Sequence, residues 1–198
     1  MGPSTGIRGT GDMDWKVIIS TLVGGLITFA ATTGQEMLKN RRIRRSAALS
    51  VGAEIIAALD IVRARAWRED VEGCYTAALE GQVIRLTIRL PKDTIPSCRT
   101  ALAQGTLGDG ELIGLVASFV MAADGLKADL DRLFEHDFGD PKCLVELDQP
   151  VHAAKLYAEM TGLLDAIESF GTDAVNRAVK MLGKDGAWLL SRVKPRDA

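Results

Sequence analysis

The longest uncharged stretch of the chain covers residues 17–35 and reads VIISTLVGGLITFAATTGQ. A helix rises about 1.5 Å per residue, so this stretch is just long enough to cross the hydrocarbon core of a bilayer, which is roughly 30 Å thick. A signal peptide has a shorter apolar region preceded by basic residues, whereas here the strong basic cluster follows. We therefore predict a transmembrane helix over residues 15–36; a buried core helix is the alternative, because the stretch contains Ser, Thr and Gly.

Small and hydroxyl-bearing residues fall on one side of this predicted helix, because they recur at intervals of three and four positions. Such residues let two membrane helices approach closely and form hydrogen bonds across the interface. We expect the helix to pack against a second copy, which makes the protein a homo-oligomer. The alternatives are small residues that are merely tolerated in a short anchor, and a hydroxyl-lined pore. The expected packing residues are Ser20, Thr21, Gly24, Gly25, Thr28, Thr32 and Gln35.

Five basic residues follow the apolar stretch: Lys39, Arg41, Arg42, Arg44 and Arg45. Lys and Arg are enriched on the cytoplasmic side of membrane helices, so we expect the N-terminus outside and the following domain in the cytoplasm. The cluster would also attract anionic headgroups of membrane lipids, at about 1 kcal/mol per basic residue. Residues 1–14, rich in Gly, Ser and Thr, are expected to form a disordered tail.

Beyond the basic cluster, residues 37–81 keep a helical spacing of apolar positions, including Ala48, Ile55, Leu59 and Val62. This spacing predicts a long juxtamembrane helix, or two helices with a bend. The apolar seam would pack either against helices of its own domain or against the same helix of a second subunit.

Residues 82–91 alternate instead, with Ile84, Leu86, Ile88 and Leu90 on one face. Alternation is the period of a half-buried strand. The sequence contains no second strand of this quality. The segment is therefore expected to be either a strand paired with its symmetry mate or an extended segment that lies over helices.

The rest of the pattern is helical. Helices are predicted over residues 96–104, 111–135 and 151–170, and from Thr172 onward. Thr94 or Asp93 would cap the first of these, and Gly171 would end the third. The predicted fold class is mainly α: one N-terminal transmembrane helix continues into a cytoplasmic bundle of four to five helices, with one short extended segment. Residues 82–198 form the bundle domain.

The charge of the chain excludes one class of partner. The formal net charge is -2, and acidic residues outnumber basic ones after the basic cluster. A domain that binds nucleic acid needs a basic face over its folded part, so no nucleic-acid partner is expected. The three cysteines form no CxxC pair or Cys/His ligand spacing, so we predict free thiols and no zinc site.

The acidic region 129–152 contains both histidines of the chain, His136 and His152. Its spacing matches no metal-ligand pattern, and solvated charges explain it. No Ser or Cys lies in a nucleophile motif, and the glycine-rich loop GTLGDG follows no strand and lacks a GK[ST] ending. We therefore predict no catalytic, cofactor-binding or metal-binding residue; an enzyme of unrecognised type that uses region 129–152 is an alternative.

Several sequence features occur in a familiar order: the apolar stretch, RRIRR, AEIIAALDIV, a short extended segment, and PSCRTALAQGTLGDGELIGLVASFVMAADGLKADLDRL. This order resembles a loose group of small bacterial single-pass membrane proteins. The resemblance implies a bacterial inner-membrane location and brings no activity and no catalytic residues with it.

Together these features predict a non-enzymatic, membrane-anchored protein that self-associates and presents its cytoplasmic helical domain to a protein partner. The alternative is an oligomeric effector that permeabilises the membrane and is gated by its cytoplasmic domain. The two hypotheses share the oligomer and differ in whether the membrane leaks.

Overall fold

The computed structural model describes residues 15–84, 86, 88, 90–91, 93–135 and 149–189. The chain divides into two compact units, Met1–Arg42 and Ile43–Ala198, called here the first and the second unit. The described residues form five α-helices and no strand, so the predicted mainly α class is confirmed. The longest helix, α1, runs from Trp15 to Ala64 and belongs to both units.

Within the first unit, the described apolar side chains of α1 are exposed; Phe29, for example, is 70% exposed. Over the described residues, no helix combines the length and the apolar character needed to cross a membrane. The side chains of residues 15–22, 24–28 and 30 lie outside the described residues. Five of the predicted packing residues therefore lie outside them as well: Ser20, Thr21, Gly24, Gly25 and Thr28.

The two other predicted packing residues, Thr32 and Gln35, are described and exposed. The Thr32 hydroxyl donates a hydrogen bond of 3.0 Å to the carbonyl of Phe29 in its own helix. Self-association through these residues stays a prediction.

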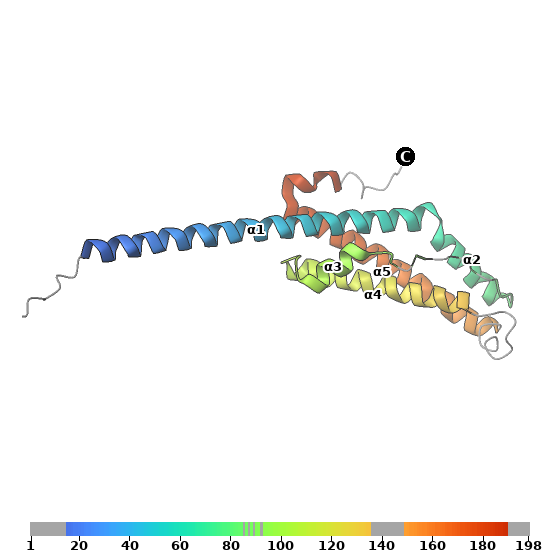
Figure 1. Ribbon diagram of the computed structural model, residues 1–198. Helices are drawn as coiled ribbons and strands as arrows, with labels where there is room; N and C mark the ends of the chain where they lie inside the picture. The colour runs from blue at the N-terminus through green and yellow to red at the C-terminus, as the bar shows by residue number, and fades with distance from the viewer. Residues whose placement is uncertain are drawn as a thin grey trace, which may run out of the picture. The chain divides into compact units, whose positions relative to one another are not determined.

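The second unit is a helical bundle around one apolar core. After α1 come α2 (Trp67–Leu79), α3 (Pro96–Gln104), α4 (Gly110–Glu135), α5 (Pro150–Leu182) and the 3-10 helix η1 (Gly183–Gly186). Helices α4 and α5 lie side by side, and α2 packs against α5 (Figure 1). The seam of α1 faces this core: Ala48, Val51, Ile55 and Leu59 are at most 4% exposed. The seam thus packs against helices of its own chain, as the first of the two alternatives predicted.

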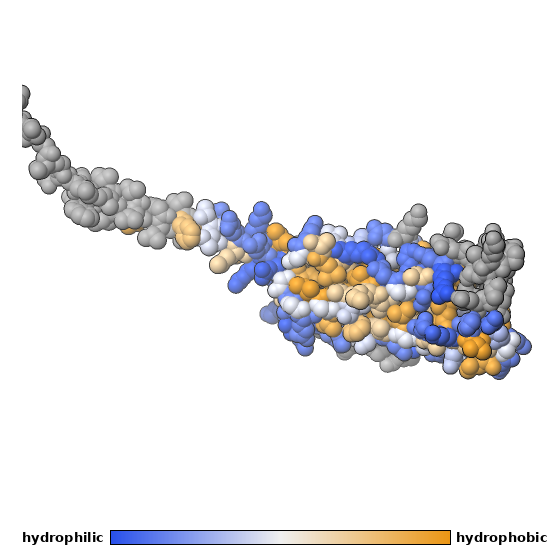
Figure 2. Space-filling model, turned by 90° about the horizontal axis from the view of Figure 1, so that it is seen from below, coloured by the Kyte–Doolittle hydropathy of each residue, from blue (hydrophilic) through white to orange (hydrophobic). Residues whose placement is uncertain are grey.

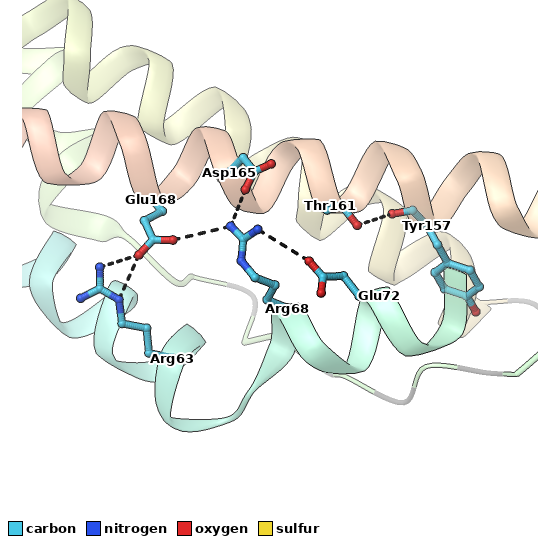
Figure 3. A network of polar contacts seen from close by, with 7 residues as sticks. All are labelled: Arg63, Arg68, Glu72, Tyr157, Thr161, Asp165 and Glu168. Carbon is cyan, nitrogen blue, oxygen red and sulfur yellow. Dashed lines mark hydrogen bonds and ion pairs between the residues drawn. The ribbon is translucent and has the colours of Figure 1, made fainter. Parts of the chain in front are cut away.

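A sharp turn separates α1 from α2, so the predicted helix over residues 37–81 is two helices. Ala66 has φ 51, a left-handed conformation that is uncommon for a residue with a side chain. Charged side chains on both sides of the turn hold it against α5 (Figure 3). Arg63 donates to Glu168 at 2.6 Å, and Arg68 pairs with Asp165.

The segment 82–95, called here the strap, has no helix or strand among its described residues, of which Leu86, Ile88 and Leu90 lie against the helices. On the apolar face that the alternation predicted, Leu86 is buried, whereas Ile84 is 49% exposed, so the prediction is wrong for Ile84. Ile88 and Leu90 pack against the core. The Tyr157 hydroxyl of α5 donates a hydrogen bond of 2.6 Å to the Ile84 carbonyl and fixes the start of the strap.

Helix α5 continues through Gly171, so the prediction of a helix end there is wrong. A Cβ built on Gly171 would lie 3.2 Å from side-chain atoms of Ile55 and of Phe119. The glycine therefore provides space for α1 and α4 to pack against α5. Tertiary packing outweighs the weak helix propensity of one glycine, which costs about 1 kcal/mol relative to alanine.

Candidate functional site

A cavity of about 270 Å³ lies in the second unit between α1, the strap and α4. Most of its lining is apolar, and Ile61, Trp67, Leu90 and Phe119 are among the residues that form its walls. Trp67 and Phe119 are 5% and 1% exposed, so both rings are fixed by packing on their other sides. It is larger than a second cavity, of about 130 Å³, between α1, α2 and α5.

Small side chains form part of the lining of the cavity. Ala57 and Ala58 on α1 and Ala123 on α4 line it where leucines would fill the space. The left-handed turn at Ala66 places Trp67 at one end, and Pro91 in the strap borders it as well. Alanine is the best helix former, so these positions stabilise their helices without filling the cavity.

Charged groups at the cavity come from three segments: Glu54 on α1, Arg65 in the turn between α1 and α2, and Asp93 in the strap. Glu54 is half-buried, whereas Arg65 and Asp93 are exposed. A half-buried charge is screened less by water and salt than an exposed one. Glu54 therefore dominates the electrostatic character of the cavity.

Glu54 also caps α3, although it lies on α1. Its carboxylate oxygens accept hydrogen bonds from the backbone N–H groups of Ser97, at 2.9 Å, and Cys98, at 2.7 Å. These N–H groups belong to the first turn of α3, where no intrahelical acceptor exists, and the helix dipole favours a negative charge there. The N-cap residue itself is Ile95, which makes no side-chain cap, so the prediction of Thr94 or Asp93 as cap is wrong.

The two described cysteines are buried free thiols. Burial raises the pKa of Cys98, and the hydrogen bond and charge of Glu54 raise it further. Burial is also the main cause that raises the pKa of Cys74, followed by the charge of Asp70. Because the thiolate is the reactive form, neither thiol is activated as a nucleophile.

An ion pair joins the loop before α4 to α5. Asp109 accepts a hydrogen bond of 2.8 Å from the backbone N–H of Leu112 and so caps α4. Arg177 of α5 binds both carboxylate oxygens of Asp109, at 3.0 and 2.7 Å. The hydrogen bond from Arg177 is the largest cause that lowers the pKa of Asp109, followed by the Leu112 N–H.

The lowered pKa of Asp109 predicts a pH dependence of stability. Its contribution is fully present above the ordinary carboxyl pKa of 3.8 and is lost as the pH falls through the lower pKa of the folded state. We expect Asp109→Asn, which keeps a capping side chain but loses the charge, to lower the melting temperature at pH 6 and to have a smaller effect near pH 3. Thermal unfolding at both pH values tests this. An effect of the substitution that grows on acidification would contradict it.

The basic cluster of the sequence spans the division between the two units, and all five side chains are exposed. Arg45 forms an ion pair of 2.6 Å with Asp185 and donates to the Leu182 carbonyl at the end of α5. Arg44 lies against Gly108, where a Cβ would come within 2.5 Å of it. Both arginines therefore contact other segments of the second unit; a role of the cluster in lipid binding and topology stays a prediction.

Residues 136–148 of the acidic region, His136 included, lie outside the described residues. In the rest of that region, as in the other described segments, no three His, Cys, Asp or Glu side chains lie close enough to hold a metal ion. Burial, followed by the charge of Glu159, raises the pKa of Asp129. Asp131 pairs with Lys127 one turn before it in α4.

Comparison of the chain with protein-family models, curated proteins and solved structures finds no match. A functional conclusion therefore rests on the residues of this chain and their geometry. The sequence patterns did not indicate the cavity or its Glu54. The available signals were a carboxylate at the edge of the α1 seam and alanines next to that seam, and both are too common to be specific.

Proposed function

We propose that this protein is a non-enzymatic anchor and scaffold of the bacterial inner membrane. In this proposal the uncharged stretch 17–35 spans the membrane, the N-terminus lies outside, and the helical domain lies in the cytoplasm and binds a protein partner. The proposal agrees with the apolar length of the stretch and with the basic cluster that follows it.

The continuity of α1 is the observation that carries the proposal. One helix, Trp15–Ala64, contains the uncharged stretch, then the basic cluster, then the seam that the domain buries through Ala48 and Ile55. The described residues contain no loop or proline between the stretch and the seam. The proposed anchor and a core helix of the domain are therefore parts of one secondary-structure element.

The exposed face of α4 is where we place the protein partner. Between Glu111 and Asp124 this helix has no charged residue, and its outer face shows Ile113, Gly114 and Met121, the last 74% exposed. Figure 2 shows apolar side chains gathered over part of the second unit as seen from below. Uncharged patches with a polar rim are typical of surfaces that bind proteins.

The cavity beside α1 favours a second candidate, the oligomeric effector that permeabilises the membrane when its cytoplasmic domain senses a ligand. Such gating needs a ligand site in contact with the helix that continues into the anchor, and α1 lines the cavity through Ala58 and Ile61. Both candidates require self-association of the anchor and differ in membrane leakage.

A combined topology and crosslinking experiment in cells tests both candidates. A reporter fused after Ala198 is expected to be active only in the cytoplasm, and cysteines placed at Thr21 are expected to crosslink two copies. We expect Gly25→Leu with Thr28→Leu to abolish the crosslinked oligomer, because leucines block close helix approach. Leu22→Phe with Leu26→Phe, which adds bulk on the side expected to face lipid, is the matched control.

Strictly monomeric wild-type protein in detergent, or a reporter that is active only outside the cytoplasm, would remove the basis of the proposal. Leakage or toxicity on overexpression that disappears in the Gly25→Leu, Thr28→Leu variant would favour the effector over the scaffold.

A further inference from the structure

We propose that the cavity between α1, α4 and the strap is a binding site for a small aromatic amine, a fused bicyclic ring that carries an alkylammonium group. Three properties of the cavity lead to this class of ligand: its volume, the aromatic rings in its walls, and the sign of the charge at its edge.

The volume sets the size of the ligand. An engineered protein cavity of about 150 Å³ lined by Leu, Ile and Phe takes up benzene. At about 270 Å³, this cavity has room for two fused rings. Its lining is mostly apolar, as is usual for small-molecule sites.

The walls favour an aromatic ring with a positive charge. Trp67 at the start of α2 and Phe119 on α4 border the cavity with buried rings. Aromatic pairs gain about 0.5–1.5 kcal/mol beyond their buried area, and a cation over a ring face is attracted by its quadrupole. Both effects act on an aromatic amine at once.

The charge at the edge selects an ammonium over a carboxylate. The described charged residues of the lining are Glu54, Asp93 and Arg65, two carboxylates against one guanidinium. Glu54 is half-buried, whereas Arg65 is exposed and therefore more strongly screened.

Glu54 retains acceptor capacity for such a group. Its two oxygens accept two backbone N–H groups of α3 and a hydrogen bond from the Cys98 thiol, which leaves one of the four lone pairs of the carboxylate. An ammonium donor can therefore bind Glu54 without displacing the cap of α3. Because the same carboxylate holds α3, occupancy of the cavity would also stabilise the start of that helix.

Titration of the purified full-length chain with three indoles tests the proposal. Tryptamine, indole and indole-3-acetate share the ring and carry a positive, no and a negative charge. We expect tryptamine to bind wild-type protein at least about tenfold more tightly than indole-3-acetate, because the two ligands differ by two charges at an acidic edge. Calorimetry or saturation-transfer NMR measures both affinities.

Two leucines in the cavity provide the variant that should lose binding. Ala58→Leu with Ala123→Leu is expected to weaken tryptamine binding by at least about tenfold while the melting temperature stays equal or rises, since cavity filling usually stabilises. Ala128→Leu, an exposed position of α4 outside the cavity, is the matched control and should bind like wild type. Equal binding by wild type and by the filled variant would overturn the proposal.

If the Ala58→Leu, Ala123→Leu variant does not fold, a charge reversal at Asp93 still tests the proposal. Asp93 is exposed and does not cap α3, so Asp93→Arg should leave the fold unchanged. It turns the edge from net negative to net positive, and we expect the preference to shift toward indole-3-acetate. An unchanged preference in this variant, or indole-3-acetate binding wild type as tightly as tryptamine, would overturn the charge assignment.

Discussion

Replacing Gly171 with leucine is expected to lower the free energy of unfolding by about 2–3 kcal/mol, the upper part of the range for overpacking of a filled core. Even the Cβ of the new side chain would lie 3.2 Å from Ile55 and Phe119, and the rest of it would have to displace them. Both neighbours are at most 1% exposed, so displacing them disturbs the packed core. Thermal or urea unfolding followed by circular dichroism measures the loss.

Gly162 provides the matched control for this prediction, since it lies in the same helix. It is exposed, and a Cβ built on it meets no atom within 4 Å. We expect Gly162→Leu to be neutral or to stabilise by up to about 1 kcal/mol, the difference in helix propensity between glycine and a good helix former. Equal losses at the two positions would mean that α5 does not pack on α1 and α4 through Gly171.

Replacing Glu54 with alanine is expected to lower the free energy of unfolding by about 2–3 kcal/mol, the range for hydrogen bonds to a charged group. The substitution leaves two backbone N–H groups at the start of α3, those of Ser97 and Cys98, without their acceptor. Both are part-buried, so water replaces the lost carboxylate poorly. Hydrogen exchange of these amides, together with chemical unfolding, measures the effect at the helix and in the whole domain.

Two further variants separate the cap from a general effect of charge. Glu54→Gln keeps one carbonyl acceptor and is expected to lower the free energy of unfolding by about half as much as Glu54→Ala does. Asp93→Ala removes a cap candidate that the sequence favoured, and since the structure gives it no capping hydrogen bond we expect a change within about 0.5 kcal/mol. A larger loss at Asp93 than at Glu54 would show that α3 is capped locally after all.

The sequence by itself determined the features that depend on neighbours along the chain. The start of α3 at Pro96 and its end before Gly105 follow from a proline that fits the first turn and a glycine that adopts φ 61. The apolar stripe of α4 and the seam of α1 are buried as their helical spacing predicts. The alternation of the strap also predicted that Leu86 would be buried, although Ile84 on the same predicted face is 49% exposed. Each of these patterns is local, because it involves residues within a few positions of one another along the chain.

Only the tertiary structure decided the features that join distant segments. Glu54 caps a helix that starts more than forty residues later, and no local pattern marks a carboxylate for that role. Considered alone, Gly171 predicts a helix end. In the structure it lies inside α5, where Ile55 and Phe119 pack against it. The cavity arises in the same way, since Ala58 and Ala123 are ordinary helix positions and come to line one cavity only because α1 and α4 are brought together. Local propensities are weak, about 1 kcal/mol per residue, and packing between helices overrides them wherever the two conflict.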